Sequence, residues 1–264
     1  MSGDAELTAE VLAGHIRRMG IAPGEMLLVH SSLKGIGWMP GGPEELVHAF
    51  QEVLTPDGTL LMPAFTYGRE TFRVGATPAA TGLLSETFRT TGGVVRSWHP
   101  THSISAWGKD AEALCADHHL REPFGADSPL DRFVDAGGRI LLLGVTHTAS
   151  STVHVGECRA KLPYISVPST RHQPVHEFIA PDGRKHRTTI TQFAGHGGAF
   201  NAVERDLRLR GAIRDGRIGA KQSTLMGAAD VVAVVLELTR QQTDILLCNN
   251  PDCHICPQRR RACR

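Results

Sequence analysis

The pattern of apolar and polar residues alternates between helix-like and strand-like segments from the start of the chain. Residues 8–20 carry apolar side chains at helical spacing, with Thr8 as the expected N-cap and Gly20 as the expected stop. Residues 26–30 are almost continuously apolar, which predicts a buried strand. The order of elements is therefore helix, then strand.

The same order repeats in the next segment. Residues 43–54 have a helical pattern that begins at Pro43, a residue favoured in the first turn of a helix. A turn at residues 56–58 then leads into the apolar segment 59–65. Strands that are apolar throughout are typical of a sheet covered on both faces, so the pattern predicts an α/β domain.

The second half of the chain continues the α/β pattern with one interruption. Residues 139–145 predict a third apolar strand, and residues 150–161 predict a helix directly after it. A Pro-Asp-Gly turn at 181–183 lies between two alternating segments and predicts an antiparallel β-hairpin insertion. A last helix is expected over 228–240, followed by a short strand over 244–248.

Composition agrees with one enzyme-sized domain. Of the 264 residues, 41% are hydrophobic and 21% charged, so we expect a single domain over residues 1–264 with a Cys- and Arg-rich tail at 249–264. The 28 basic and 27 acidic residues give a formal charge of +1, which provides no global attraction to nucleic acid or an anionic membrane. A polar N-terminal segment and the lack of a long apolar run predict a cytoplasmic protein.

Four of the six cysteines lie close to the C-terminus. Cys253 and Cys256 form a C-x-x-C pair next to His254, which is half of a tetrahedral zinc site that Cys248 or Cys263 could complete. Because only one such pair is present, the sequence favours free thiols on a solvated basic tail, and we predict no metal for the chemistry. The three arginines at 259–261 could contact nucleic acid, but the near-zero net charge favours a solvated end.

Three polar clusters are candidates for chemistry. The first follows the strand at 26–30, where Ser31 and Ser32 begin a glycine-rich loop that offers hydrogen-bond donors to an anionic or amide-rich ligand. An ordinary strand-to-helix loop fits the spacing equally well. Neither the phosphate-binding loop of nucleotide hydrolases nor the dinucleotide fingerprint occurs, so phosphoryl and hydride transfer lack their usual support.

The second cluster covers residues 94–108. Arg96 could grip a phosphate with two hydrogen bonds, while Ser97, Thr101 and Ser103 offer hydroxyl groups. The alternative is a packed loop whose histidines and tryptophan have structural roles only.

The third cluster contains the clearest catalytic candidates. If residues 150–161 are helical, His154 and Glu157 lie three residues apart on one face, just beyond a buried strand. A carboxylate that orients an imidazole makes a general base for neutral pH. The alternative is an intrahelical surface pair, and the location at the end of a strand favours the catalytic interpretation. A serine hydrolase is a rival class, but no G-x-S-x-G segment occurs.

Five segments in this order resemble one known family. The chain resembles the aminoglycoside 3-N-acetyltransferases, also called antibiotic N-acetyltransferases, over roughly residues 8–165. The matching segments are HSSLKGIGWMPGGPEELVHAF, LLMPAF, RSWHPTHSISAWG, SPLDRFVDAGGRILLLGV and STVHVGECRAKLPY.

The resemblance implies a fold and a reaction. The fold is a single α/β domain of the antibiotic N-acetyltransferase type, distinct from GNAT acetyltransferases, with a central sheet flanked by helices. The activity is direct acetyl transfer from acetyl-coenzyme A to an amine, with His154 as general base and Glu157 as its support. Coenzyme A would be held by Ser31, Ser32, Leu33, Lys34, Arg96, Ser97 and Ser103.

The implied acceptor is the 3-amino group of an aminoglycoside antibiotic, with resistance as the result. Some family members carry acidic residues in two stretches where this chain has residues 66–70 and 192–198, so Tyr67, Glu70 and His196 are the substrate-binding candidates here. The alternatives are the same chemistry on another amine of a biosynthetic pathway, and a non-enzymatic zinc or nucleic-acid binding module. The sequence determines neither the acceptor nor the oligomeric state, with a homodimer left open.

Overall fold

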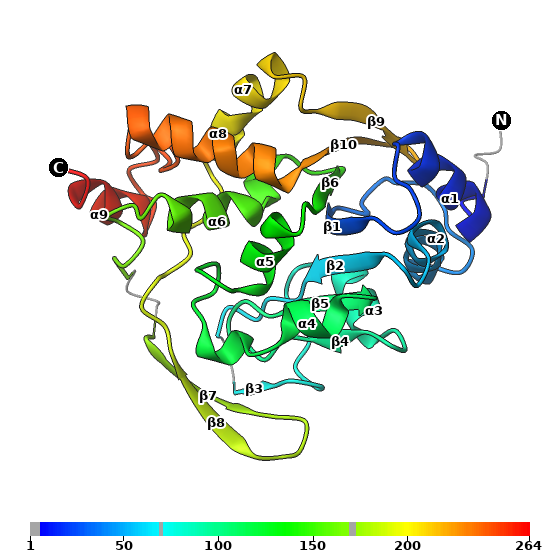
Figure 1. The fold of residues 1–264 in the computed structure, drawn as a ribbon, viewed down its shortest axis with the longest axis horizontal. Helices are drawn as coiled ribbons and strands as arrows, with labels where there is room; N and C mark the ends of the chain where they lie inside the picture. Colours follow the sequence, from blue (N-terminus) through cyan, green and yellow to red (C-terminus); the bar gives the residue numbers. More distant parts are fainter. Residues whose placement is uncertain (1–5, 69–70, 169–172) are drawn as a thin grey trace.

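The computed structural model describes residues 6–68, 71–168 and 173–264, and a seven-stranded mixed sheet lies at the centre of this part (Figure 1). The strand order is β4-β5-β2-β1-β6-β10-β9; β1 is parallel to β2 and β6, and the other neighbours are antiparallel. The strands are β1 (Met26–Ser31), β2 (Thr59–Pro63), β4 (Val95–Arg96), β5 (Ile104–Gly108), β6 (Arg139–Leu143), β9 (Arg214–Ile218) and β10 (Lys221–Gly227).

Helices cover both faces of the sheet because alternate residues of its strands point to opposite sides. In β1, Leu27 and Val29 join one hydrophobic cluster, whereas Leu28 joins the other. The first cluster packs under α1 (Ala9–Arg18), α2 (Glu44–Leu54) and α3 (Leu83–Thr90). The second packs under α4 (Ala111–Cys115), α5 (Pro129–Asp135), α6 (Thr152–Arg159), α7 (Glu204–Leu209) and α8 (Ala228–Gln241).

Helix α6 packs closely against α8 on this second face (Figure 1). A Cβ atom at Gly156 would lie 2.6 Å from Cγ1 of Val235, so the glycine allows the two helix backbones to approach. Short 3-10 turns lie beside these helices, at η1 (His118–Leu120), η2 (His147–Ala149) and η3 (Phe200–Val203). The turn η2 connects the end of β6 to α6.

The predicted hairpin is confirmed. Strands β7 (Val175–Ile179) and β8 (Lys185–Thr189) are antiparallel, and β3 (Phe72–Arg73) joins them in a separate three-stranded sheet. The hairpin extends away from the central sheet (Figure 1). Phe72 and Phe178 are fully buried and form its small core together with Val74.

Most of the predicted elements are present with nearly the expected bounds. The Thr8 cap is confirmed, because its hydroxyl oxygen accepts a hydrogen bond from the Val11 amide at 3.4 Å. The strand predicted at 244–248 is wrong: the segment forms turns, with the Ile245 amide bonded to the Gln242 carbonyl. Leu246 and Leu247 are buried all the same, since a buried turn and a buried strand give the same apolar pattern.

The prediction that the C-terminal segment is a solvated basic tail is also wrong. Residues Cys256–Arg261 form helix α9, in which Cys256 and Arg259 are buried. The Arg259 guanidinium donates to the backbone carbonyls of Val167 and Phe193, so this cation joins separate segments rather than facing water. In the residues that the structure describes, no helix is long and apolar enough to cross a bilayer.

Candidate active site

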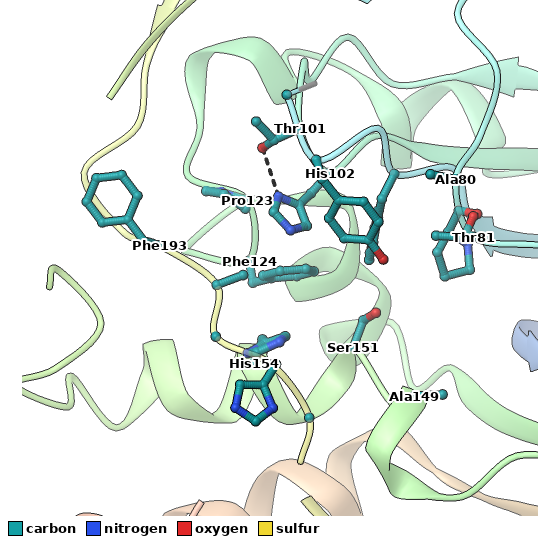
Figure 2. A pocket seen from close by; sticks show the side chains of 18 of the residues that line it. Ala80, Thr81, Thr101, His102, Pro123, Phe124, Ala149, Ser151, His154 and Phe193 are labelled. Carbon is teal, nitrogen blue, oxygen red and sulfur yellow. Dashed lines mark hydrogen bonds between the residues drawn. The ribbon is translucent and has the colours of Figure 1, made fainter. Parts of the chain in front are cut away.

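A cavity of about 710 Å³ opens at the carboxyl ends of β1, β2 and β6 (Figure 2). This is the edge at which an open α/β sheet presents loops to a ligand. The walls come from segments far apart in the sequence. They include His30, Ser31, Phe65, Tyr67, Thr101, His102, Phe124, Ser150, Ser151, His154, Phe193, His196, Phe200 and Ile255.

His154 lies on α6 and lines the cavity, with 12% of its side chain exposed. The imidazole stacks on Phe124 at a centroid distance of 4.9 Å and meets the edge of Phe200 at 4.8 Å. Two aromatic rings from other segments therefore fix the plane of the imidazole.

Glu157 holds the far side of the same imidazole. Its Oε2 lies 2.6 Å from Nδ1 of His154, and its Oε1 accepts a hydrogen bond from the Tyr164 hydroxyl at 2.6 Å. Burial raises the pKa of Tyr164 above its ordinary value, so this hydroxyl stays a donor. With Nδ1 donating to the carboxylate, Nε2 is the nitrogen of His154 that can accept a proton.

A second buried histidine lies at the base of the cavity. His30 is 5% exposed, and burial lowers its pKa to about 3, so the ring is neutral near pH 7. Its Nε2 accepts the backbone amide of Ser151 at 3.4 Å. Among the residues that the structure describes, the buried Ser150 hydroxyl has no hydrogen-bond partner, and Ser150 belongs to the cavity lining. Figure 2 shows the Ser151 hydroxyl pointing into the cavity.

The other histidines of the sequence clusters divide between the cavity and the interior. His102 lines the cavity, where its Nδ1 lies 2.8 Å from the Thr101 hydroxyl (Figure 2). His147 is buried outside the cavity lining, with Nε2 2.7 Å from a carboxylate oxygen of Glu204. His102 is therefore the better placed of the two to reach a substrate.

Arg96 does not fit the predicted phosphate contact. Its side chain is buried, and its guanidinium donates to the carbonyls of Ala64, Val74 and Thr77 as well as to the Ser103 hydroxyl. Burial lowers its pKa to about 9. These four acceptors direct the guanidinium group to interior partners, and the contact between Arg96 and coenzyme A stays a prediction.

Ser97 and Ser103 are also interior residues, and their contact with coenzyme A stays a prediction. The Ser97 hydroxyl lies 2.8 Å from Nδ1 of His118 and accepts the Ile104 amide at 2.8 Å. The Ser103 hydroxyl donates to the Ala64 carbonyl at 2.6 Å. Both serines are completely buried and do not belong to the cavity lining.

The position of the loop after β1 is compatible with the predicted coenzyme A contact. Ser31 lines the cavity, and Ser32, Leu33 and Lys34 follow it at the same end of the strand. The Ser32 amide bonds to the Leu143 carbonyl at 2.9 Å, which ties the start of this loop to β6.

The substrate-binding candidates have different outcomes. Tyr67 lines the cavity with a φ of 57°, and its ring meets the edge of the His102 ring. His196 also belongs to the wall, although its Nε2 faces three cysteine sulfurs. Glu70 lies outside the described residues.

Several residues of the site have no signal in the sequence. Phe124, Tyr164 and Phe200 are single aromatic residues in unrelated segments, and only the fold brings them to His154 and Glu157. For Tyr164, its place in the last matching segment was the only available hint.

Comparison with known proteins identifies the family. The model of the family described as aminoglycoside 3-N-acetyltransferase matches residues 28–240. The chain belongs to the aminoglycoside 3-N-acetyltransferase family. Aminoglycoside N(3)-acetyltransferase IV of Salmonella sp is 32% identical over 228 residues, which cover 85% of this chain and 84% of that protein. Aminoglycoside N(3)-acetyltransferase VII of Streptomyces paromomycinus is 31% identical, with 87% and 90% covered.

Solved structures of this family have the same fold. A histidine-to-alanine variant of aminoglycoside acetyltransferase AAC(3)-IVa in complex with a gentamicin has a TM-score of 0.86 and 30% identity, covering 99% of this chain and 100% of that one. AAC-IIIb in a binary complex with CoASH has a TM-score of 0.77 and 29% identity, covering 89% and 97%.

These comparisons confirm the resemblance, the fold class and the enzyme class predicted from the sequence. The protein is an N-acetyltransferase of the aminoglycoside 3-N-acetyltransferase family, with acetyl-coenzyme A as donor. A non-enzymatic binding module is thereby excluded as the main function.

Proposed function

We propose that the protein transfers the acetyl group of acetyl-coenzyme A to the 3-amino group of an aminoglycoside and so confers resistance. The observation that carries this proposal is the chain of hydrogen bonds from Tyr164 through Glu157 to His154 at the wall of the large cavity. It provides a base of fixed orientation beside a space large enough for two substrates to meet.

The reaction needs a base because an ammonium group is not nucleophilic. The amine nitrogen attacks the thioester carbonyl, its proton moves to Nε2 of His154, and the carboxylate of Glu157 stabilises the resulting imidazolium. The N–C bond forms, the C–S bond breaks, and coenzyme A leaves as the thiolate, which takes up the proton that the His154 imidazolium releases, so the neutral base is restored.

Hydrogen-bond donors must stabilise the oxyanion that develops on the thioester carbonyl. We assign this role to the hydroxyl groups of Ser150 and Ser151, which line the cavity next to α6. The loop of Ser31, Ser32, Leu33 and Lys34 remains our proposal for the coenzyme A contact. It begins at the cavity, and Lys34 adds a cation for a phosphate.

A second acceptor class is favoured by one feature of the cavity. Among the described residues that line it, none is aspartate or glutamate. An aminoglycoside is a polycation, and a protein usually binds one with carboxylates. The alternative is therefore the same acetyl transfer to a less charged amine of a biosynthetic pathway.

A direct assay separates the two acceptor classes. Release of free coenzyme A thiol is measured with a panel of aminoglycosides and with monoamines of similar size, and each product is identified by its mass and by NMR. Acetylation at the 3-amino group of an aminoglycoside is the expected result. If only the monoamines react, the aminoglycoside is the wrong substrate, although the catalytic assignment stands.

The setting of this reaction follows from the donor. We propose that the enzyme acts in the cytoplasm, where acetyl-coenzyme A is available, on small-molecule amines and without nucleic-acid or membrane partners. A homodimer remains compatible with the proposal.

A further inference from the structure

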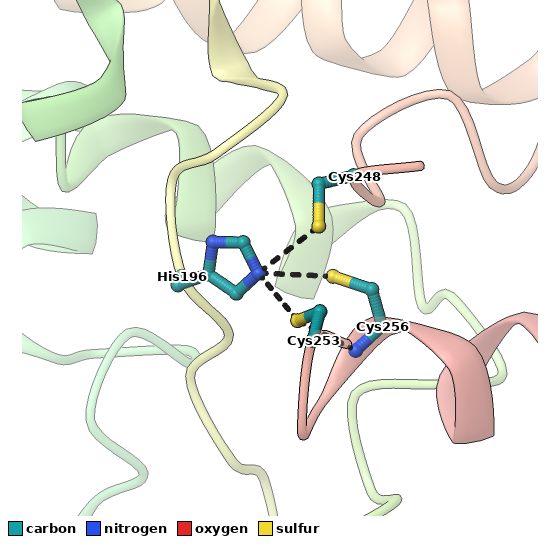
Figure 3. Close-up of side chains that lie close together, drawn as sticks. All are labelled: His196, Cys248, Cys253 and Cys256. Atoms are coloured by element: carbon teal, nitrogen blue, oxygen red, sulfur yellow. Dashed lines mark hydrogen bonds between the residues drawn. The ribbon is translucent and has the colours of Figure 1, made fainter. Parts of the chain in front are cut away.

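Four side chains with metal-binding atoms meet at the wall of the cavity. His196, Cys248, Cys253 and Cys256 place one nitrogen and three sulfur atoms within 4.8 Å of one another (Figure 3). His196 comes from the loop after the hairpin and Cys248 from the segment after α8. Cys253 lies in the loop before α9, and Cys256 is the first residue of this helix.

The distances fit one shared ion. Nε2 of His196 lies 3.4 Å from Sγ of Cys248, 2.9 Å from that of Cys253 and 3.3 Å from that of Cys256. In a tetrahedral zinc site, bond lengths of about 2.3 Å to sulfur and about 2.0 Å to nitrogen separate these atoms by roughly 3.5 Å. The three nitrogen–sulfur distances therefore need to grow by only about 0.1–0.6 Å to reach this value.

The backbone around the four residues is arranged to bring them together. A Cβ atom at Gly197 would clash with the Thr148 carbonyl oxygen, so the loop that carries His196 needs a glycine to pass this point. The Cys256 amide donates to Sγ of Cys253 at 3.4 Å, which orients that sulfur toward the cluster. Arg260 donates to the carbonyls of Leu247 and Cys248 and so holds the third segment.

We propose that His196, Cys248, Cys253 and Cys256 bind one Zn²⁺ ion in a closed structural site. Three thiolates and one imidazole are a donor set that tetrahedral zinc prefers. All four positions are filled by protein ligands, so the ion has no place for a substrate and serves the fold rather than the chemistry.

Zinc binding moves protons in a defined way. The metal requires thiolates and a lone pair on Nε2, so the thiol protons are released and the imidazole proton must be on Nδ1. In the structure the Gly198 amide donates to Nδ1 of His196 at 3.0 Å. This amide must therefore turn away when the ion binds.

The site explains why His196 lies at the cavity although its Nε2 faces sulfur. Residues 194–197 and Ile255 belong to the cavity wall, and the ion would join these two segments on its outer side. His196 then fixes the position of the wall instead of contacting the amine. This inference does not depend on which amine is acetylated.

The experiment measures metal content in the full chain, purified under reducing conditions without chelator. We expect elemental mass spectrometry to find one zinc ion per protein chain. Cys263→Ser is the matched control: its thiol lies beyond the end of α9, outside the ligand cluster, where it donates to the Arg259 carbonyl at 3.6 Å. Cys253→Ser should lose the zinc, whereas Cys263→Ser should keep it.

A second measurement covers the case in which Cys253→Ser does not fold. The wild-type chain, stripped of metal and reduced, is titrated with Co²⁺, which should give thiolate charge-transfer bands and the strong visible bands of a tetrahedral ion. Absence of both zinc and the Co²⁺ spectrum would overturn the proposal. So would equal metal loss in Cys263→Ser, or an intact mass two hydrogens lower, which indicates a disulfide.

Discussion

At the scale of single residues, the catalytic proposal rests on which nitrogen of His154 is engaged by protein. Because Nδ1 contacts Glu157, only Nε2 can take a proton from an amine. We predict that His154→Ala lowers kcat by about a hundredfold to ten-thousandfold, the usual share of general-base catalysis. Coenzyme A affinity, measured by calorimetry on protein of matched thermal stability, should be nearly unchanged. A folded variant that acetylates its best amine at the wild-type rate would remove His154 from the mechanism and leave His102 as the next candidate.

The substitution Glu157→Gln should lower kcat less than His154→Ala does, and it should also shift the pH–rate profile. In Glu157→Gln the negative charge that stabilises the imidazolium is lost, so we expect the acidic limb of the pH–rate profile to move to lower pH. The amide keeps an oxygen that can still accept the Nδ1 proton, so the decrease in kcat should be smaller than for His154→Ala. A profile that keeps its acidic limb in place would show that the carboxylate has no electrostatic role.

Arg96 provides a prediction opposite to the one that the sequence favours. Arg96→Met should leave the carbonyls of Val74 and Thr77 without their donor, at about 1–3 kcal/mol each and not strictly additive. The Ala64 carbonyl keeps its hydrogen bond from the Ser103 hydroxyl. We expect a large loss of unfolding free energy in urea, with the KM for acetyl-coenzyme A unchanged in the protein that remains folded. A stable variant with a raised KM for acetyl-coenzyme A would instead support the hypothesis that Arg96 contacts a phosphate of coenzyme A.

These residues also show how far the sequence leads at this scale. His154 and Glu157 were predictable because both lie on one helix, where a spacing of three residues implies contact. The interior position of Arg96 was not, since a buried arginine and a ligand-binding arginine differ only in which carbonyls surround them. The contact of Tyr164 with Glu157 was not predictable either. Tyr164 follows the end of α6, and only the path of the chain after the helix brings its hydroxyl back to Glu157.

At the scale of elements, the contact between α6 and α8 depends on one missing side chain. Gly156→Ala would push a methyl group into Val235, and overpacking of this kind costs about 1–3 kcal/mol. Gly14→Ala is the control: it lies in α1, where a new Cβ would meet only the end of Arg18 at 3.5 Å. There alanine should be neutral or stabilise by about 0.5–1 kcal/mol. Chemical denaturation compares the two, and equal effects would contradict the packing role of Gly156.

The sequence predicted the most apolar strands, the hairpin and the longest helices, but it missed several shorter helices and strands. The apolar strands β1, β2 and β6 are signalled by composition alone, because they are buried on both faces. Strand β9 reads Arg-Asp-Gly-Arg-Ile and lies at the sheet edge, so it lacks an apolar run and was not predicted. Its partner β10 is recognisable only once the sheet is known.

At the scale of the whole molecule, buried neutral histidines should make the fold sensitive to acid. Burial lowers the pKa of both His30 and His118 to about 3, compared with about 6.5 in an unfolded chain. Between these values the unfolded chain binds protons that the folded chain does not, so stability falls as the pH decreases from about 6.5. Each histidine contributes up to about 1.4 kcal/mol per pH unit over this range.

This dependence can be measured by urea unfolding between pH values of about 7 and 5. His118→Gln should reduce the slope of unfolding free energy against pH, whatever it does to the absolute stability. His48→Gln is the control, because His48 is exposed on α2. If both variants keep the wild-type slope, the buried His118 is not responsible for acid sensitivity.

The central place of β1 in the sheet has a consequence for how the protein is made. Strand β1 pairs on one side with β2 but on the other with β6, whose first paired residue follows more than a hundred positions later. At about 5–20 residues per second, a ribosome needs roughly 5–20 s to deliver that partner. During this interval the growing chain exposes an apolar strand edge, the kind of surface that recruits other strands. The nascent protein should therefore depend on chaperones until β6 has emerged.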